Sequence, residues 1–537
     1  MPKFKKNCLL MVANKTGIVE IGKRLKRLKY RIFASHGTTK VLREAGLRCT
    51  DISTITGRKP ILNHKVVSLN GDLHGGCLAY TPEEIAELEK LCLVKFDLVY
   101  IHYYPLHSVI AKPGVTYEEI LDAWDVGGPS MTMSAAKGNR IIATDPAEMN
   151  HVLNQLEKYG EISAEERRRL VAKAVHTVIT YYMPLATYLS DGQYQYLAGK
   201  LAIKCKYGEN PWQTPAALFA TDNDDPLALH RFDLVEGADP SYINFTDFNR
   251  CLQAMTHVIA AFRVNRIKAK YFAVIVKHGN AIGASYGNSK TEVIKKTLAG
   301  NPRAAWGGIL ITNFTIGEAE AELLRTYLIK KQQRILDGVL TPAITIGAIS
   351  ILKRAQGLCR IMINKELRNP ALDVSTIIHT VRGGFLRQPN FEYVFNFKHD
   401  KVDQYGRLAR RKKTDLLLAW ALCSTSSSNT ITIVNNCMLI GNGTGQDDRV
   451  GAAQLAIRKA RTFKHLLKGA VCCSDSFFPY VDGPRALVQA GIIAILTVSG
   501  SKIKGAGDKA VKAYLLKHKV TLIWIPVSLG RMFYGHC

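Results

Sequence analysis

Residues 272–283 read FAVIVKHGNAIG, an apolar run that ends in a cation, an imidazole and a glycine-containing turn. The β-branched run at 272–276 predicts a buried strand. Gly279 and Gly283 let the chain turn sharply or lie against a ligand. A positive charge at Lys277 keeps the ring of His278 neutral, and a neutral ring accepts a proton at pH 7. The pair predicts a general base, although a solvated lysine beside a hydrogen-bonded histidine fits the same letters.

The composition describes a globular protein of several domains. The chain has 537 residues, of which 47% are hydrophobic and 22% charged. A chain of this length is too long for one core. It contains no run of 18 apolar residues, so no membrane-spanning helix is expected. The 12 cysteines show no metal-ligand spacing, which predicts reduced thiols in a cytoplasm and no bound metal.

The formal net charge of +28 raises the question whether the protein binds nucleic acid. Its densest runs are 23–29 and 407–413. Leu25 and Leu28 give the first run the spacing of an amphipathic helix with a solvated basic face. The second run is typical of an exposed connector. Neither run is interleaved with aromatic residues, so we expect small anionic substrates and not nucleic acid.

The first 150 residues alternate strands and helices. Apolar segments at 8–13, 31–35 and 98–104 predict strands, and 17–28 predicts a helix. This alternation is typical of a doubly wound parallel sheet, which binds ligands at the carboxyl ends of its strands. Two of those ends, Asn14 to Gly17 and Ser35 to Thr38, carry hydroxyl groups and free amides suited to phosphate. Plain helix caps explain them as well.

The sequence changes character near residue 197. A helix is expected over Ala164 to Leu189, and an irregular loop follows at 206–213. Strands are expected near 271–276, 307–312, 430–434 and 492–497, with a basic polar stretch from Lys398 to Lys413 between two halves. We therefore expect domains at 1–197 and 198–537. The second would contain two similar α/β subdomains, at about 198–397 and 414–537, although no repeat is visible by identity.

Taken in order, short motifs along nearly the whole chain resemble the bifunctional purine-biosynthesis enzymes that combine AICAR transformylase with IMP cyclohydrolase. AICAR is 5-aminoimidazole-4-carboxamide ribonucleotide. Any one motif is common, but their order and spacing together are specific. The motifs are Asn14 to Gly17, Ser35 to Thr38, Tyr104-Pro105, Asp125 to Gly128, Ala135 to Lys137, Lys206 to Thr214, Lys277-His278, Trp306 to Gly308, Arg382 to Gly384, Ser428-Asn429, Gly443 to Gln446 with Arg449, Ser474 to Pro479, and Arg531.

The resemblance implies a fold and an assembly. The fold is an N-terminal doubly wound sheet like methylglyoxal synthase, followed by two cytidine-deaminase-like α/β subdomains without the deaminase zinc. The implied assembly is a homodimer whose transformylase site forms between two subunits. The implied ligands are AICAR, formyl-AICAR and IMP, with 10-formyltetrahydrofolate as cosubstrate and no metal.

The resemblance also assigns roles in the second domain. His278 resembles the base that takes a proton from the AICAR amine, and Lys277 resembles its cationic neighbour. Asn429 resembles an oxyanion donor, a kind of group worth on the order of 3 kcal/mol. The residues that resemble substrate and folate ligands are Lys206, Tyr207, Asp337 and Arg531 for the nucleotide, and Arg449 and Phe477 for the folate. Core filling is the alternative for Phe477.

Three positions depart from the family's transformylase pattern. The arginine usual before Tyr207 is Lys206, which loses bidentate geometry. The lysine that the family usually has five positions before Asn429 is replaced by Ser424. The family's usual Asn-Pro-Cys is replaced by Asn280-Ala281-Ile282. A weaker grip on the substrate is expected.

The first domain resembles the cyclohydrolase less closely. The residues that match its catalytic groups are Tyr104, Asp125 and Lys137, and those that match its substrate ligands are Lys15, Thr16, Ser35, Gly37, Thr38, Lys65 and Ser68. The family's active-site lysine and histidine are replaced by Val67 and Asn70. The family's Ser-x-Ser is replaced by Met11 to Ala13, and one asparagine of the family is replaced by His102. Lys65 or His36 could supply the lost cation.

These observations predict formyl transfer to AICAR, followed by ring closure to IMP. Two alternatives stay open. One is a transformylase whose cyclohydrolase domain has degenerated, and the other is a homologue that binds nucleotides or nucleic acid without catalysis.

Overall fold

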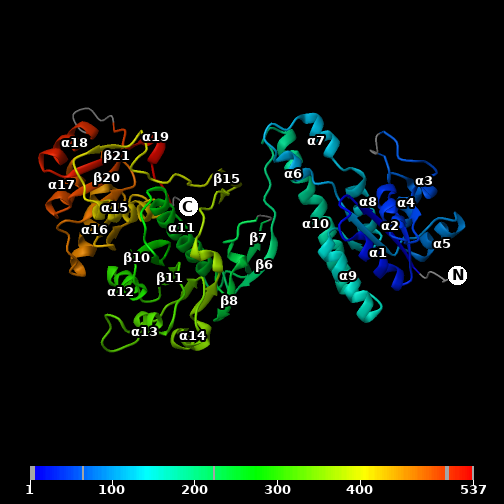
Figure 1. The fold of residues 1–537 in the computed structure, drawn as a ribbon, viewed down its shortest axis with the longest axis horizontal. Helices are drawn as coiled ribbons and strands as arrows, with labels where there is room; N and C mark the ends of the chain where they lie inside the picture. Colours follow the sequence, from blue (N-terminus) through cyan, green and yellow to red (C-terminus); the bar gives the residue numbers. More distant parts are fainter. Residues whose placement is uncertain (1–5, 63–65, 222–223, 502–506, 535–537) are drawn as a thin grey trace. The chain divides into compact units, whose positions relative to one another are not determined.

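A computed structural model describes residues 6–62, 66–221, 224–501 and 507–534. The chain divides into two compact units, Met1–Ala198 and Gly199–Cys537. Figure 1 shows the elements of each unit in chain order, from blue to red.

The first unit is built on a five-stranded sheet in the order β3-β2-β1-β4-β5, whose neighbouring strands all pair in parallel. Its strands are β1 (Lys6–Val12), β2 (Tyr30–Ala34), β3 (Thr50–Asp51), β4 (Leu98–His102) and β5 (Ile141–Ala143). The order reverses between β1 and β4, which is the position where such sheets bind ligands. The prediction of a doubly wound parallel sheet is confirmed.

Helices cover this sheet, and its core consists of the apolar strand residues and the helix faces packed on them. The helices are α1 (Ile18–Arg27), α2 (His36–Glu44), α3 (Ser53–Thr56), α4 (Gly71–Leu78), α5 (Pro82–Lys90), α6 (Leu106–Ile110), α7 (Tyr117–Ala123), α8 (Gly127–Lys137), α9 (Pro146–Tyr159) and α10 (Ala164–Leu189). As expected from its leucine spacing, α1 buries Leu25 and exposes Lys23, Lys26 and Arg27, whereas Arg24 is largely covered and pairs with Glu157.

The second unit contains a 12-stranded sheet that consists of two halves with the same order and strand directions. The first half runs β10 (Asn280–Gly287), β9 (Tyr271–Lys277), β11 (Ile309–Thr312), β12 (Gly338–Thr341), β13 (Arg360–Ile363) and β8 (Asp233–Glu236). The second runs β18 (Met438–Gly443), β17 (Ile431–Asn435), β19 (Val471–Ser474), β20 (Ala494–Ser499), β21 (Thr521–Pro526) and β16 (Asp403–Tyr405).

Each half begins with an antiparallel hairpin, continues through three parallel strands and ends on an antiparallel edge strand. β10 and β18 pair and join the halves. The two similar subdomains expected from the sequence are therefore present as a repeat of topology.

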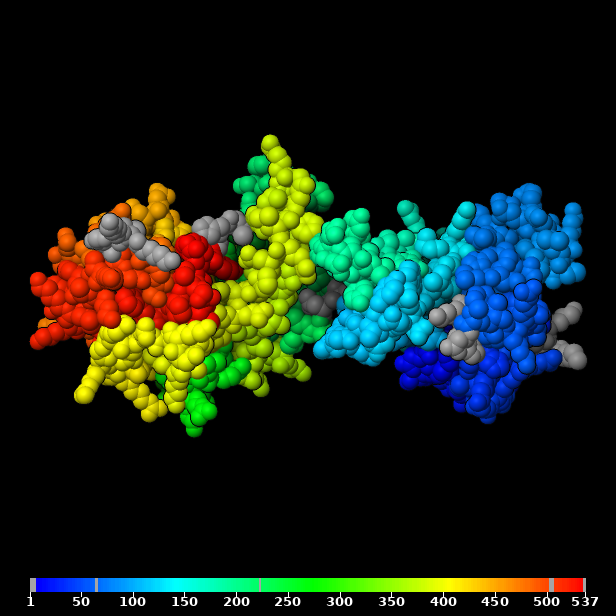
Figure 2. Space-filling view, turned by 90° about the horizontal axis from the view of Figure 1, so that it is seen from above, coloured from blue at the N-terminus to red at the C-terminus, as the bar shows by residue number. Residues whose placement is uncertain are grey.

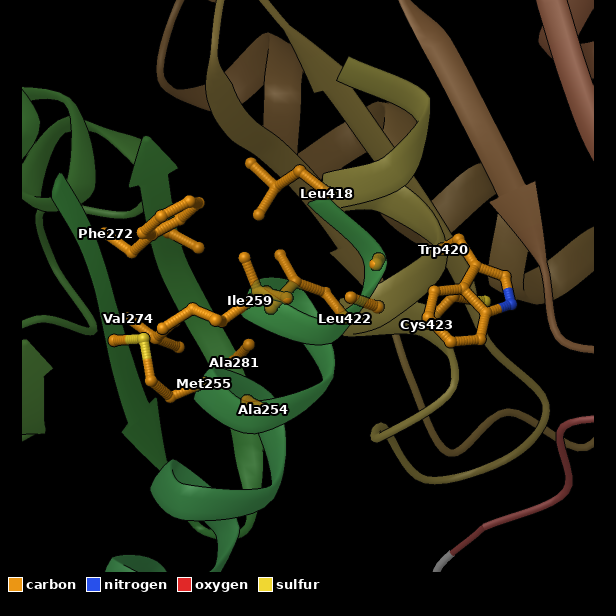
Figure 3. Packing of buried hydrophobic residues seen from close by; sticks show 14 of the residues in the cluster. Ala254, Met255, Ile259, Phe272, Val274, Ala281, Leu418, Trp420, Leu422 and Cys423 are labelled. Carbon is orange, nitrogen blue, oxygen red and sulfur yellow. The ribbon is translucent and has the colours of Figure 1, made fainter. Parts of the chain in front are cut away.

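Two helices pack together at the middle of this sheet, α11 (Tyr242–Val264) and α15 (Arg410–Cys423). Figure 3 shows Ile259 of α11 and Leu422 of α15 in the same core as Phe272 and Val274 of β9. Ala273 and Ile275 of β9 belong to a second core on the other face. Because both faces of β9 are buried, the strand is apolar throughout, as residues 272–276 predicted.

The other helices of this unit are α12 (Lys290–Gly300), α13 (Glu318–Thr326), α14 (Ile346–Leu352), α16 (Arg449–Thr462), α17 (Asp482–Gln489), α18 (Gly507–Lys517) and α19 (Val527–Gly530), with 3-10 turns at Leu229–Arg231, Ala355–Gly357 and Lys365–Arg368. Two small sheets pair β6 (Lys200–Cys205) with β7 (Ala216–Ala220), and β14 (Thr376–Val381) with β15 (Gly384–Pro389). Figure 2 shows the yellow-green segment that contains the β14–β15 hairpin standing out from the surface of the second unit.

The basic run at 407–413 is only partly the exposed connector that its charge suggested: residues 406–409 link β16 to α15, and Arg407, Arg410 and Arg411 are exposed. Residues 403–405 form the edge strand β16, and α15 begins at Arg410. Lys412 donates to the side chain of Asn435 at 2.5 Å, and Lys413 lies over the ring of Phe397 at 5.0 Å. Their charged ends remain near the surface while the rest of the helix is buried, which is ordinary for lysine at a helix end.

Candidate active sites

His278 lies in a two-residue turn at the end of β9. Lys277 closes β9 and Asn280 opens β10, so His278 and Gly279 alone form the turn. Their φ angles are +50° and +74°, as a type I′ hairpin requires. Glycine adopts this conformation freely, and histidine is among the few other residues enriched in it. The turn presents His278 as an exposed side chain at the edge of the buried sheet.

Asp247 of α11 holds this turn in place. Its carboxylate accepts the N–H of His278 at 3.3 Å and that of Gly279 at 2.7 Å. The carboxylate is buried. Burial raises the pKa of Asp247, and the two N–H donors partly offset that effect. Asp247 was not predicted as a site residue, because its only signal in the sequence is an acidic residue in a largely apolar helix.

Lys277 faces Asp337 across Gly307. Its Nζ donates to the carbonyl of Trp306 at 2.7 Å. A Cβ placed on Gly307 would lie 3.6 Å from both Lys277 Nζ and Asp337 Oδ2, so the two charges share this space. Asp337 also pairs with Arg354 at 2.6 Å. The structure thus places Lys277, His278 and Asp337 in one region.

Asn280 connects this turn with the turn that contains Asn429. Its side-chain amide donates to the carbonyl of His278 at 3.2 Å, and its oxygen accepts the N–H of Ser427 at 3.0 Å. Asn429 itself donates to the carbonyls of Gln446 at 2.9 Å and Asp447 at 3.2 Å. The amide of Asn429 is therefore near the base but occupied by loop carbonyls in this structure.

Arg449 pairs with a buried carboxylate instead of reaching into open space. Its Nη2 donates to Asp475 at 3.0 Å, and Asp475 also accepts the hydroxyl of Ser428. Asp475 is wholly buried, which raises its pKa in spite of Arg449. Phe477 follows two residues later and is half-buried, whereas Phe478 is in the core.

The C-terminal segment also contacts this site. Arg531 is exposed, with its guanidinium 4.0 Å from the ring centroid of Phe533. The next residue, Met532, donates its N–H to the carbonyl of Asp475 at 2.9 Å. Tyr534 accepts the N–H of Ser428 at 3.1 Å through its carbonyl. Hydrogen bonds in the described part of the chain therefore link the segments that carry His278, Asn429, Arg449 and Arg531.

Lys206 and Tyr207 follow β6 in the chain and lie beside the beginning of α11. The N–H of Lys206 donates to the carbonyl of Pro240 at 3.2 Å, and the carbonyl of Tyr207 accepts the N–H of Tyr242 at 3.0 Å. Lys206 is exposed and Tyr207 half-buried. From Tyr242 to Asp247 the helix rises by about 7.5 Å. No hydrogen bond or ion pair joins Lys206 or Tyr207 to His278 among the residues that the structure describes.

In the first unit, two of the predicted phosphate loops meet. Lys15 donates to the carbonyls of Val12 and Ala13, and a Cβ on Gly37 would lie 3.7 Å from Lys15 Cε. Burial lowers the pKa of Lys15. The nearby hydroxyls are already bonded within their loops, Thr16 to Asn14 at 2.8 Å and Ser35 to Thr38 at 3.1 Å.

Asp125 lies at the beginning of α8, close to Tyr104 and Ser68. Its carboxylate accepts the N–H of Gly128 at 2.8 Å, and the N–H groups of Tyr104 and Gly127 also lower its pKa. Burial outweighs these donors and raises the pKa of Asp125. A Cβ on Gly127 would lie 2.9 Å from Ser68 Oγ, so Ser68 borders the same corner. The ring of Tyr104 is exposed.

Lys137 is not brought to this corner. It is the last residue of α8, which has 11 residues and is therefore about 16 Å long. It is exposed and interacts electrostatically with Glu84. Asn70, which replaces a family histidine, caps α4 by accepting the N–H of Asp72 at 2.9 Å. Lys65 lies outside the described residues.

His102 ends β4 beside Lys15. Its Nδ1 is buried and has no hydrogen-bond partner among the described residues. Burial lowers the pKa of His102, an effect opposed by Asp145 and reinforced by Lys15. The alternative cation, His36, instead pairs with Asp51 at 3.0 Å.

Two negative findings apply to the described residues. Within 6–62, 66–221, 224–501 and 507–534, no helix is long and apolar enough to cross a membrane. The same ranges contain no group of three or more His, Cys, Asp or Glu side chains that could hold a metal ion.

Comparison with protein families assigns both units. Residues 135–459, more than half of the chain, match the family described as AICARFT/IMPCHase bienzyme. Residues 17–130 match the MGS-like domain. Four of the five strands of the first unit, all but β1, and the turn that carries His278 lie within these matches.

Similar proteins cover nearly the whole chain. The bifunctional purine biosynthesis protein PurH of Anoxybacillus flavithermus is 33% identical over 508 residues, with 93% of this chain and 95% of the relative covered. The protein of the same name from Nostoc punctiforme is 32% identical over 525 residues, with 93% and 96% covered. PurH of Bacillus cytotoxicus is 30% identical over 511 residues, with 93% and 95% covered. The chain belongs to the AICARFT/IMPCHase bienzyme family.

Proposed function

We propose that this protein formylates AICAR in purine biosynthesis and closes the formylated product to IMP. Membership of the bienzyme family supports both activities, and one observation supports the first directly. That observation is the exposed His278, fixed by Asp247 in a strained turn beside Lys277 and Asp337.

The geometry supplies a base for formyl transfer. The amine nitrogen of AICAR attacks the formyl carbon of 10-formyltetrahydrofolate, and His278 takes the proton that the amine loses. The bond between the formyl carbon and N10 of the folate then breaks, and N10 leaves as tetrahydrofolate with the proton that His278 accepted. Lys277 adds positive potential near the oxygen of the tetrahedral intermediate. For Asn429 to donate to that oxygen, its amide would have to leave Gln446 or Asp447.

The remaining predicted contacts are part of the proposal. Asp337 and Arg531 would bind the nucleotide together with Lys206 and Tyr207. Phe477 would contact the pterin, whereas the pairing of Arg449 with Asp475 favours a structural role beside any contact with folate. No metal enters the reaction.

We further propose a homodimer in the cytoplasm. In the second unit, the β14–β15 hairpin leaves Leu386 and Phe385 exposed, 61% and 40% of each side chain, on a two-stranded arm. Such an arm is only marginally stable alone, and a second subunit would cover it. The dispersed, reduced cysteines fit a cytoplasmic location.

The test of formyl transfer is turnover of AICAR and 10-formyltetrahydrofolate by the purified chain. His278→Ala should lower kcat by about 100-fold or more, the usual contribution of a general base. His518→Ala, an exposed histidine of the same unit, serves as the control. Equal turnover of the two variants would contradict the role of His278.

Ring closure is tested separately with formyl-AICAR as substrate. IMP formation would establish the second activity, and its absence with intact formyl transfer would favour a transformylase with a degenerate first domain. The replacement of the family's lysine and histidine by Val67 and by the helix cap Asn70 favours this second candidate. A protein without either activity, retained on nucleic acid in a salt-dependent manner, would favour the non-catalytic alternative.

A further inference from the structure

Arg250 lies between the base turn and the C-terminal segment. It is three residues after Asp247 on α11 and therefore on the same face of the helix. A Cβ on Gly279 would lie 3.6 Å from Arg250 Nε. On its other side, the guanidinium lies 4.1 Å from the ring centroid of Tyr534. Tyr534 is held to the same helix by a hydrogen bond from its hydroxyl to Gln253.

One N–H group of this guanidinium has no partner. Arg250 Nη1 is buried, and no hydrogen bond to it exists among the described residues. Asp247 interacts electrostatically with Arg250, but its two carboxylate oxygens accept the amides of His278 and Gly279. A buried donor on a charged group is costly to leave unsatisfied. Arg449 Nε is buried without a partner as well, but its guanidinium is paired with Asp475, whereas no ion pair to Arg250 exists among the described residues.

We infer that Arg250 is a substrate-binding residue that donates to an oxyanion of a substrate bound beside His278. This inference rests on the proposed formyl transfer and assigns a further ligand to the same site. A guanidinium held by stacking on Tyr534 and by contact with Gly279 is preorganised for a planar or tetrahedral oxyanion. It supplies the fork geometry that Lys206 lacks.

The oxyanion has two possible sources in this reaction. One is the phosphate of the nucleotide, and the other is a glutamate carboxylate of the folate. Both have the same chemistry, and substrates that lack either group distinguish them.

The experiment compares Arg250→Met with Arg263→Met in the full chain. Arg263 lies in the last turn of the same helix, is exposed and donates to Asn369 at 2.6 Å, so its replacement controls for loss of one positive charge on α11. The measured quantities are kcat and KM for AICAR and for its riboside, which has no phosphate, and for mono- and triglutamyl 10-formyltetrahydrofolate.

If Arg250 binds the phosphate, Arg250→Met lowers kcat/KM for AICAR by about 10- to 100-fold and leaves that for the riboside within 2-fold, because a charge-assisted hydrogen bond contributes a factor of that size. If it binds the folate, KM for both folates rises by about 10-fold and the nucleotide-to-riboside ratio is unchanged. Arg250→Lys, which keeps the charge without the fork, should recover part of the loss.

The inference is overturned if Arg250→Met matches Arg263→Met in every ratio, or if nucleotide and riboside lose kcat equally with unchanged KM for both folates. The latter result means that Arg250 only supports the fold of the His278 turn. Activity of the wild-type protein tests the proposed function separately, since the inference depends only on ratios between variants. If the wild type has no turnover, binding of AICAR and its riboside to both variants by calorimetry gives the phosphate comparison.

Discussion

Asp247 and Asp415 occupy equivalent positions in the two halves of the second unit. Asp415 of α15 accepts the N–H of Asn436 at 3.1 Å and that of Cys437 at 2.8 Å. These two residues form the turn between β17 and β18, with φ angles of +51° and +65°. Asp247 does the same for the turn between β9 and β10. The same arrangement of a carboxylate and two amides fixes both turns, but only the turn between β9 and β10 carries a histidine.

This equivalence predicts different effects for the same substitution. Asp247→Asn should lower kcat of formyl transfer by about 10- to 100-fold, because an amide can accept from only one of the two N–H groups and charged hydrogen bonds contribute about 1.5–3 kcal/mol. Its melting temperature should fall less than that of Asp415→Asn, because Asp415 also accepts the hydroxyl of Tyr286. The measurement is steady-state turnover beside thermal unfolding.

Asp415→Asn is the matched control. Asp415 is wholly buried and also accepts the hydroxyl of Tyr286 at 2.9 Å. We expect its loss to lower the melting temperature by several degrees while kcat of the folded enzyme is unchanged. Parallel losses of kcat and stability in both variants would contradict a positioning role for Asp247.

The sequence predicts local features of this protein well. The apolar run at 272–276, its glycines and the β/α alternation before residue 150 depend on neighbours along the chain, and the structure confirms the strand, the turn and the parallel sheet. The two halves share topology and not sequence identity. The repeat was therefore expected from the spacing of motifs and not from identical residues.

Contacts between distant segments could not be predicted. The sequence does not show that Asp247 holds a turn 31 residues later or that Asp475 is the partner of Arg449. It also does not show that the amide of Asn429 is bonded to a loop, or that Lys137 lies at the far end of α8 from Asp125. Such relationships depend on how elements pack, which residue type alone does not determine.

Arg449→Met should destabilise the protein in a pH-dependent manner. It leaves the carboxylate of Asp475 buried without its cation, a change that costs about 3–5 kcal/mol. The pKa of Asp475 is already raised by burial and would rise further. A carboxyl whose folded pKa exceeds its unfolded value favours folding at low pH, and this contribution is lost as pH rises through the folded pKa. The difference in melting temperature from wild type should therefore grow from pH 5 to pH 8.

The double variant Arg449→Met, Asp475→Asn supplies the control for this pH dependence. It has no buried carboxylate at this position, so its melting temperature should differ from wild type by a nearly constant amount across the same pH range. If Arg449→Met is fully stable and only raises KM for folate, the pair with Asp475 has no structural role.

His102 should make the protein less stable in mild acid. Burial lowers the pKa of His102 in the folded state. The unfolded chain then binds a proton near pH 6.5 that the folded chain resists, so stability falls as pH drops below that value. His102→Asn should reduce the loss of melting temperature between pH 7.5 and pH 5.5. His74 has the same direction of shift, so part of the slope should remain. An unchanged slope would contradict a buried, neutral His102.

Lys137→Ala and Asp125→Asn separate two interpretations of the first site. Asp125 lies beside Tyr104 and Ser68, whereas Lys137 lies about 16 Å away along α8 and near Glu84. If one chain forms the cyclohydrolase site, Lys137→Ala should retain ring closure of formyl-AICAR within about 2-fold. Asp125→Asn should lower it by about 100-fold, because a proton-transfer group typically contributes a factor of that size. Equal losses in both variants would mean that Lys137 acts in a neighbouring subunit's site, and mixing the two inactive variants should then restore activity by forming hybrid dimers.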